Sequence, residues 1–140
     1  MTWWYRNEEL INIPDKMEGF VYLITNLDND KKYIGKKTFW TRRKDPKTGR
    51  RKKLEGDWRK YFGSCDQLKE DVKNLGEDKF RREILYLCPH KKSMSYYETA
   101  EQFKREVLLR EDYYNTNVEG RFFSSEKERI YGIVLSGIIF

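Results

Sequence analysis

The feature that most constrains the fold is a pair of strand-like segments joined by a short turn. Phe20 to Thr25 is a run of β-branched and aromatic residues, and Lys31 to Lys36 is a second short run that favours a strand. The residues between them, Asn26 to Asp30, are mostly small polar types that favour turns. The sequence therefore predicts a β-hairpin with a loop of about five residues.

Downstream segments predict two helices and one more strand. Ser64 to Leu75 has apolar residues at helical spacing, and Gly76 is a typical helix end. Lys79 to Cys88 alternates and then becomes apolar, which indicates a third strand. Ser93 to Arg110 predicts a second helix, whose expected buried stripe is Tyr96, Ala100, Phe103 and Val107. The expected fold class is α/β (α+β), with a small three-stranded antiparallel sheet flanked by helices.

The length of 140 residues predicts a single domain. We expect an irregular N-terminal lead-in over residues 1–18, anchored by aromatic residues, and a folded domain over 19–123. That domain includes a basic insert, residues 36–60, after the second strand. Residues 124–140 form an apolar C-terminal tail, suited to a closing strand or a subunit contact, so a homodimer is kept open.

Composition excludes several classes of protein. The two cysteines and one histidine show no C-x-x-C pair, so neither a disulfide framework nor a zinc site is expected. The N-terminus lacks the apolar core of a signal peptide, and the longest apolar run is too short to span a bilayer. We therefore expect a soluble intracellular protein with no membrane association.

Charge is concentrated in the insert. Between Lys36 and Lys53 there are ten lysines and arginines and one acid. One interpretation is a solvated, mobile basic loop; the other is an arm that contacts phosphates of double-stranded DNA. The residues predicted to bind nucleic acid are Lys36, Lys37, Arg42, Lys44, Arg50, Arg51, Lys52 and Lys53. Aromatic residues on either side of the run would anchor it or stack on bases: Phe39, Trp40, Trp58, Tyr61 and Phe62.

The two segments of the hairpin carry a recognisable paired motif. Phe20-Val21-Tyr22 followed by Tyr33-Ile34-Gly35 resembles the motifs of the GIY-YIG nuclease domain, with Phe20 where the name-giving glycine usually stands. Glu98 resembles the family's metal-binding glutamate, and Asn115 its late asparagine. The run from Asp57 to Ser64 is similar to one in small free-standing phage endonucleases of this family. For a phage-encoded chain the host cytoplasm is the expected location.

The resemblance implies metal-dependent hydrolysis of phosphodiester bonds in DNA. Glu98 would hold Mg²⁺ (or Mn²⁺), which prefers oxygen ligands. Tyr22 would accept the proton of the attacking water, with its pKa lowered by Lys32 and Lys36, and Tyr33 would orient water or phosphate. Arg43 would contact the phosphate, with Arg42 and Arg59 as alternatives. Together with Asn115, these are the predicted catalytic residues; no cofactor other than the metal ion is expected.

Each of these residues also has a purely structural interpretation. Both tyrosines suit strands as ordinary cross-strand aromatics. Glu98 completes a capping box with Ser95, and Glu101 competes with it as the metal ligand. Asn117 competes with Asn115, and either suits a turn.

Two other functions stay open from the sequence. A nucleic-acid-binding protein without catalytic activity would keep the fold and the basic insert, and an interaction module would use the same basic face on an acidic protein. Within the nuclease class, homing, degradation of host DNA and repair of branched DNA are not separated.

Overall fold

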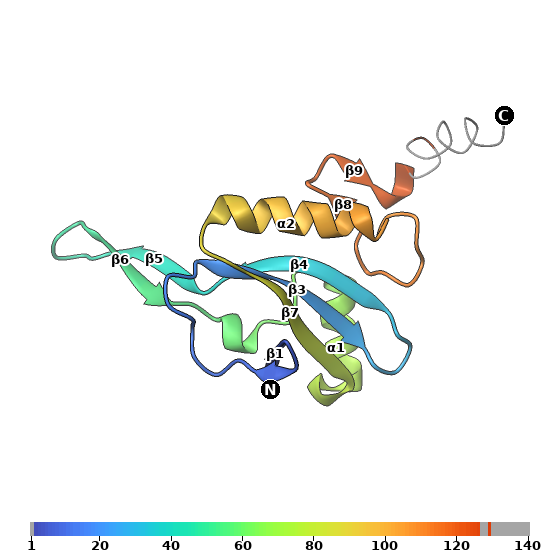
Figure 1. Cartoon of the computed structure of the whole chain (residues 1–140), viewed down its shortest axis with the longest axis horizontal. Helices are drawn as coiled ribbons and strands as arrows, with labels where there is room; N and C mark the ends of the chain where they lie inside the picture. Colours follow the sequence, from blue (N-terminus) through green and yellow to red (C-terminus); the bar gives the residue numbers. More distant parts are fainter. Residues whose placement is uncertain (1, 127–128, 130–140) are drawn as a thin grey trace.

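The computed structural model describes residues 2–126 and 129. Its centre is a five-stranded sheet in the order β2-β1-β7-β3-β4. The two α-helices, α1 (Asp66–Leu75) and α2 (Lys91–Lys104), pack on opposite faces of this sheet (Figure 1). The strands are β1 (Trp3–Tyr5), β2 (Glu8–Glu9), β3 (Gly19–Asn26), β4 (Lys32–Thr38) and β7 (Phe80–Cys88).

The predicted hairpin and third strand form the middle and one edge of the sheet. β3 pairs antiparallel with β4 on one side and with β7 on the other, and residues 27–31 form the hairpin loop. β3 is buried along its whole length. Phe20, Tyr22 and Ile24 pack in the core under α1, whereas Val21 and Leu23 pack in the core under α2. Helices on both faces explain why the strand is continuously apolar rather than alternating.

The sheet is larger than the predicted three strands, because the N-terminal lead-in is not irregular throughout. β1 pairs in parallel with β7, and β2 pairs antiparallel with β1. The Trp3 side chain is almost fully buried, and its indole nitrogen donates to the carbonyl of Trp58 at 2.8 Å. The N-terminal lead-in lacks the alternation of apolar and polar residues that would predict a strand. The buried Trp3 side chain anchors β1 beside β7.

Helix α2 ends earlier than predicted and presents a different face to the sheet. Its buried residues are Met94, Glu101 and Gln102. Tyr96 and Phe103, two members of the predicted apolar stripe, are exposed, so that stripe was wrong apart from Val107 in the following turns. The helix covers the sheet with a partly polar face, which hydropathy alone does not reveal.

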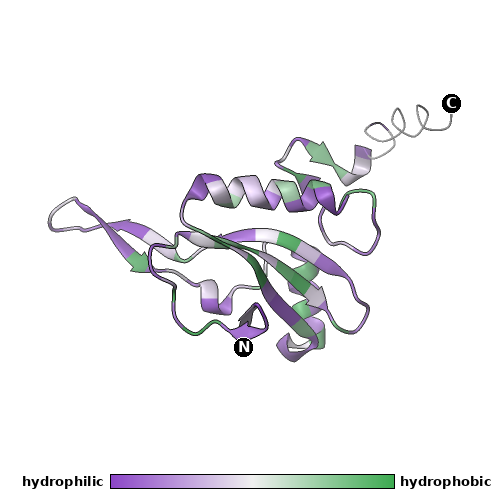
Figure 2. Cartoon of the chain, viewed as in Figure 1, coloured by the Kyte–Doolittle hydropathy of each residue, from purple (hydrophilic) through white to green (hydrophobic). Residues whose placement is uncertain are grey.

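The basic insert folds into a second hairpin instead of an irregular loop. Strands β5 (Trp40–Lys44) and β6 (Arg51–Glu55) pair antiparallel and project from the body (Figure 1). The arm is predominantly hydrophilic in Figure 2. The flanking aromatics are anchors, because Phe39, Trp58 and Phe62 are buried in the core. Trp58 lies in the short 3-10 helix η1 (Trp58–Lys60), and a second such turn, η2 (Glu77–Lys79), precedes β7.

After α2 the chain forms a small hairpin and a short turn. Strands β8 (Asn117–Val118) and β9 (Phe122–Phe123) pair antiparallel, and η3 (Ser124–Glu126) follows. The predicted apolar tail lies almost entirely outside the described residues.

Candidate active site

A polar pocket of about 490 Å³ lies beside β4, the edge strand of the sheet. One wall comes from the start of α1 and the residues before it, and the other from α2 and the loop that follows it. Because β4 is at the edge, side chains from both faces of the sheet meet there. The lining residues are Tyr33, Ser64, Cys65, Asp66, Gln67, Glu98, Gln102, Asn115, Thr116, Asn117 and Glu119.

Tyr33 is the tyrosine of the paired motif that faces this pocket. Its hydroxyl lies 3.0 Å from the hydroxyl of Ser64, which the chain delivers from just before α1. Gly63 makes this approach possible, since its φ is +89° and a Cβ there would lie 3.4 Å from the Tyr33 ring and 2.8 Å from Leu68. A left-handed residue packed this closely favours glycine.

Tyr22 lies behind Tyr33 and does not line the pocket. Its ring centroid is 6.1 Å from that of Tyr33, and its side chain is completely buried. The register places Tyr22 opposite Gly35, where a Cβ would approach to 2.6 Å from the Tyr22 Cζ. The glycine of the motif therefore makes room for the tyrosine on the neighbouring strand.

The electrostatics of the two motif phenols do not favour a base, so the base role of Tyr22 stays a prediction. Burial raises the pKa of Tyr22 well above its usual value, and the neighbouring phenols of Tyr61 and Tyr33 raise it further. Burial also raises the pKa of Tyr33 to about 12. No lysine is among the main influences on the Tyr22 pKa: the Lys32 ammonium pairs with Asp30, and the Lys36 ammonium bonds Ser95 and lies near Glu98. Both phenols are protonated at neutral pH.

Glu98 points toward the pocket from α2, with a side chain that is 19% exposed. Burial raises the pKa of its carboxyl group, and the nearby ammonium of Lys36 partly counteracts this effect. The Lys36 Nζ lies 3.9 Å from Glu98 Oε1 and donates a hydrogen bond of 2.8 Å to Ser95 Oγ. Ser95 is inside the helix, which begins at Lys91 with His90 as its N-cap, so the Ser95–Glu98 capping box is not formed.

The competing glutamate, Glu101, is engaged elsewhere. Its carboxylate accepts hydrogen bonds from the Tyr86 hydroxyl at 2.6 Å and from Arg105 Nε at 2.8 Å. It does not line the pocket. Among the two candidates, the geometry therefore places Glu98 at the pocket.

Asn115 fixes the edge strand, although it also lines the pocket. Its amide oxygen accepts from the Ile34 backbone nitrogen at 3.0 Å, and its amide nitrogen donates to the Ile34 carbonyl at 2.8 Å. The side chain thus mimics a paired strand along β4. Both of its polar atoms are used on the middle residue of the Tyr33-Ile34-Gly35 motif, which indicates a positioning role for Asn115. Asn117 also lines the pocket, but its amide oxygen accepts from the Gly120 backbone nitrogen at 3.0 Å.

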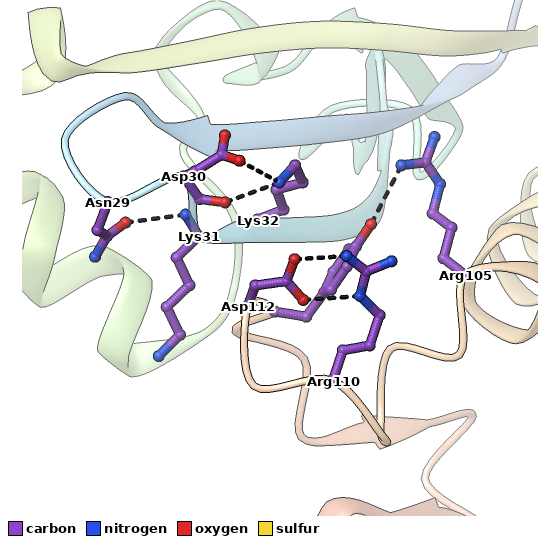
Figure 3. A network of polar contacts seen from close by, with 8 residues as sticks. Asn29, Asp30, Lys31, Lys32, Arg105, Arg110 and Asp112 are labelled. Carbon is purple, nitrogen blue, oxygen red and sulfur yellow. Dashed lines mark hydrogen bonds and ion pairs between the residues drawn. The ribbon is translucent and has the colours of Figure 1, made fainter.

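The loop that carries Asn115 is itself held by polar contacts, which Figure 3 shows. Arg110 binds Asp112 through two hydrogen bonds of 2.8 and 2.7 Å, and Arg105 donates to the Tyr113 hydroxyl at 3.3 Å. The backbone of Lys32 bonds to Asp112 and Tyr114 on this loop. These contacts set the position of Asn115 against β4.

The structure does not bring the predicted arginine to this pocket. Arg43 lies on β5 and lines a separate depression together with Arg59. Arg42 makes two hydrogen bonds, of 2.8 and 3.2 Å, to the carboxylate of Glu18. Of the predicted nucleic-acid-binding residues, Lys36 lies beside the pocket, Lys37 pairs with Asp57 at 2.6 Å, and the others belong to the projecting hairpin.

The donor set suits a cation held by few protein ligands. Within residues 2–126 and 129, no group of three or more histidine, cysteine or acidic side chains is placed to share a metal ion. Glu98 is the carboxylate that would hold a cation here, and Asp66 and Glu119 are the other acids that line the pocket. Mg²⁺ is commonly held by few protein ligands.

Among the pocket residues that sequence reasoning missed, Gln102 and Ser64 contact the Tyr33-Ile34-Gly35 motif. Gln102 lies one helical turn after Glu98, donates to the Ile34 carbonyl at 3.2 Å, and leaves its side-chain oxygen buried with no hydrogen-bond partner in the described part of the chain. Ser64 begins the segment that the sequence predicts to be helical, whereas α1 begins at Asp66 with Cys65 as its N-cap. The i, i+4 spacing of Glu98 and Gln102 was the available signal for the first. Only the tertiary contact with Tyr33 reveals the second.

The domain has an α+β fold in which a hairpin of two tyrosine-bearing strands forms part of the sheet. A glutamate from the covering helix α2 reaches the pocket at the edge strand β4. This arrangement matches the one that the motif resemblance predicts. The sequence model described as "Putative endonuclease segE, GIY-YIG domain" matches residues 3–118, so the chain belongs to this GIY-YIG family. It is 32% identical over 106 residues to "Putative endonuclease segD" of Enterobacteria phage T4. That match covers 76% of this chain and 40% of the relative, so the chain spans less than half of the relative's length. No solved structure matches the chain significantly.

The matched region includes β1, so the lead-in contributes both to the sheet and to the family domain. No helix in the described residues is long and apolar enough to cross a membrane.

Proposed function

We propose that the chain is a metal-dependent endonuclease that hydrolyses phosphodiester bonds of double-stranded DNA. The observation that carries this proposal is that Glu98 and Tyr33 line one polar pocket at the edge of β4, with the Lys36 ammonium 3.9 Å from the Glu98 carboxylate. A carboxylate, an ammonium and a phenol are the groups that hydrolysis of a phosphodiester requires for metal binding, charge stabilisation and hydrogen bonding to water. Membership of a family described as endonucleases supports it.

Glu98 is the proposed metal ligand, for Mg²⁺ or Mn²⁺. The cation supplies Lewis-acid stabilisation of the phosphate charge when it is bound. Burial raises the pKa of Glu98, so a cation at this position removes an unfavourable buried negative charge. The positive charge of Lys36 favours the ionised form of the carboxylate and is available to a phosphate at the same edge.

Tyr33 and Ser64 are proposed to orient the attacking water and the scissile phosphate. Their hydroxyls already share a hydrogen bond of 3.0 Å at the pocket wall. With a pKa of about 12, the Tyr33 phenol is a proton donor at neutral pH rather than a base. Tyr22 supports the Tyr33 ring from behind, while Asn115 and Gln102 hold the Ile34 backbone and thereby position the whole motif.

The proposal is tested by nicking of supercoiled plasmid with Mg²⁺, with Mn²⁺ and with EDTA. Glu98→Gln should abolish scission and leave DNA binding intact, because it removes the metal ligand and preserves the shape of the side chain. Glu8→Gln is the matched control: Glu8 is exposed on β2, at the opposite edge of the sheet from β4. Scission that survives EDTA, or full activity of Glu98→Gln, would refute the proposal.

A second candidate function is binding of DNA without cleavage. It is favoured by one observation: among the described residues, no arginine lines the pocket, although arginine is the residue best matched to two phosphate oxygens. Tight, salt-sensitive binding of linear and branched duplexes without scission, in either metal, would establish this alternative.

A further inference from the structure

The net charge of the chain resides in the β5–β6 hairpin. Residues 40–55 contain eight lysines and arginines and two acids, a net charge of +6. The whole chain has 29 basic and 23 acidic residues, which is also +6 with histidine neutral. The remainder of the molecule is therefore neutral on balance, and attraction to a polyanion is concentrated in one projecting arm (Figures 1 and 2).

Both faces of the arm are basic. Three successive cross-strand pairs consist only of cations: Arg42 with Lys53, Arg43 with Lys52, and Lys44 with Arg51. Successive pairs point to opposite faces of a two-stranded ribbon. Arg43 and Lys52 therefore form one face, while the pairs on either side of them form the other.

This arrangement opposes the stability of the ribbon itself. Like charges directly opposite each other are unfavourable, and an isolated two-stranded hairpin is at best marginally stable. Within the described residues, carboxylate partners of these six cations are limited to Glu18 for Arg42 and Asp45 for Lys52. All six are exposed. A binding partner with negative charge on both sides of the ribbon would remove the repulsion.

The base of the arm is anchored firmly. Arg42 is held by Glu18, the Trp40 indole donates to the Met17 carbonyl at 2.9 Å, and Phe39 is fully buried. The arm therefore projects from the body in a defined direction instead of trailing as a flexible basic loop.

We propose that the β5–β6 hairpin enters the major groove of a B-form duplex, with a phosphate strand against each face. This inference rests on the proposed DNA function and specifies how the substrate is held. Each strand has five residues and spans about 17 Å. The major groove, about 12 Å wide, admits a two-stranded ribbon, whereas the minor groove, about 6 Å wide, does not. A-form RNA is disfavoured because its major groove is deep and narrow.

The first test measures duplex binding of the full chain in EDTA, so that its result is independent of cleavage. Two double variants each remove one cation pair, from opposite faces of the ribbon: Arg43→Ala with Lys52→Ala, and Lys44→Ala with Arg51→Ala. The control, Lys69→Ala with Lys73→Ala, removes the same charge from exposed positions on α1. Circular dichroism checks that each variant is folded.

Each face variant should make the negative slope of log K against log salt shallower by about 1.8, at about 0.9 per phosphate contact. If the variant and the wild-type chain bind equally at about 1 M salt, the variant should bind about 60-fold more weakly than the wild type at about 0.1 M salt. The control should change the slope by far less. If only one of the two variants binds DNA more weakly, the ribbon lies with one face along a single phosphate strand, and insertion into the groove is refuted. Equal binding of the wild-type chain to an A-form RNA duplex would also overturn it.

The second test locates the groove by dimethyl sulfate protection at saturating protein. Guanine N7 lies in the major groove and adenine N3 in the minor groove. Protection of guanine N7 that is lost in both face variants supports the proposal, and protection of adenine N3 alone refutes it. Plasmid scission with unchanged guanine N7 reactivity would refute the hairpin inference and leave the nuclease proposal standing. Protection of guanine N7 without any plasmid scission would refute the nuclease proposal and leave the hairpin inference standing.

Discussion

Removing the hydroxyl of Tyr22 should stabilise the protein. The side chain is completely buried, and within the described residues its hydroxyl makes no hydrogen bond of standard geometry, although the Tyr61 phenol lies close enough to interact with it. A polar group that loses its water on folding without gaining a partner costs about 1–3 kcal/mol. Tyr22→Phe removes this penalty and keeps the aromatic ring that packs against Trp3 and Tyr33.

The expected gain follows from two opposing contributions. The void left by the hydroxyl, roughly 10 Å³ at about 24 cal/mol per Å³, costs about 0.2 kcal/mol. The net effect is therefore an increase of about 1–3 kcal/mol in the free energy of unfolding. For a chain of this size, each kcal/mol corresponds to a Tm rise of about 4 °C.

Tyr33→Phe is the matched control, because it makes the same chemical change on the neighbouring strand. The Tyr33 hydroxyl has a partner in Ser64, so this substitution should lower the free energy of unfolding by about 0.5 kcal/mol, the small value expected at a solvent-exposed bond. Urea denaturation measures the change in the free energy of unfolding for both variants, which should be positive for Tyr22→Phe and negative for Tyr33→Phe. A loss of stability in Tyr22→Phe would mean that its hydroxyl is satisfied, and would refute the reasoning.

Three further predictions concern the pocket. Asn115→Ala should lower the free energy of unfolding by about 1–3 kcal/mol, measured in urea, because it leaves the Ile34 backbone nitrogen unpaired and leaves the Ile34 carbonyl with only the Gln102 bond; an unchanged midpoint would contradict the positioning role. Glu98→Gln should raise the Tm at pH 7 in EDTA. Burial raises the pKa of Glu98, so the ionised form destabilises the fold as the pH rises through that raised pKa, and the advantage of glutamine should vanish below about pH 4, where unperturbed glutamates are protonated. An equal gain at both pH values would show that it has another origin. Gln102→Leu should reduce plasmid nicking about tenfold, equivalent to about 1.4 kcal/mol of transition-state stabilisation, while the Tm shifts by less than about 4 °C. Unchanged nicking would show that the free amide oxygen of Gln102 is not used.

The elements that sequence reasoning located are those with strong local signals. The hairpin of β3 and β4 has strand-forming runs around a polar turn, and α1 ends at Gly76 with a φ of +94°. The strand before Pro89 was also located, as β7. In each case the local preference agrees with the packing, so nearest-neighbour chemistry was sufficient.

Where the prediction was wrong, the tertiary environment overrode the local pattern. The apolar spacing on α2 pointed to Tyr96 and Phe103, yet the helix turns Glu101 and Gln102 toward the sheet. These polar side chains are acceptable there because Tyr86, Arg105 and the Ile34 carbonyl bond to them. Tyr86 on β7 and Ile34 on β4 come from other elements, so no helical periodicity can show them, whereas Arg105 lies at i+4 from Glu101 at the end of α2 itself.

The sequence by itself determined the order of the central elements, the paired tyrosine motif with its glycine and the concentration of positive charge in one insert. These depend on residue type and short-range spacing. The tertiary structure alone decided that Tyr33 faces the pocket while Tyr22 is buried, that Glu98 and not Glu101 reaches it, and that Arg43 does not. The physical reason is that the pocket forms at a sheet edge, where segments distant in the chain meet, and burial and pairing there set the protonation and the role of each side chain.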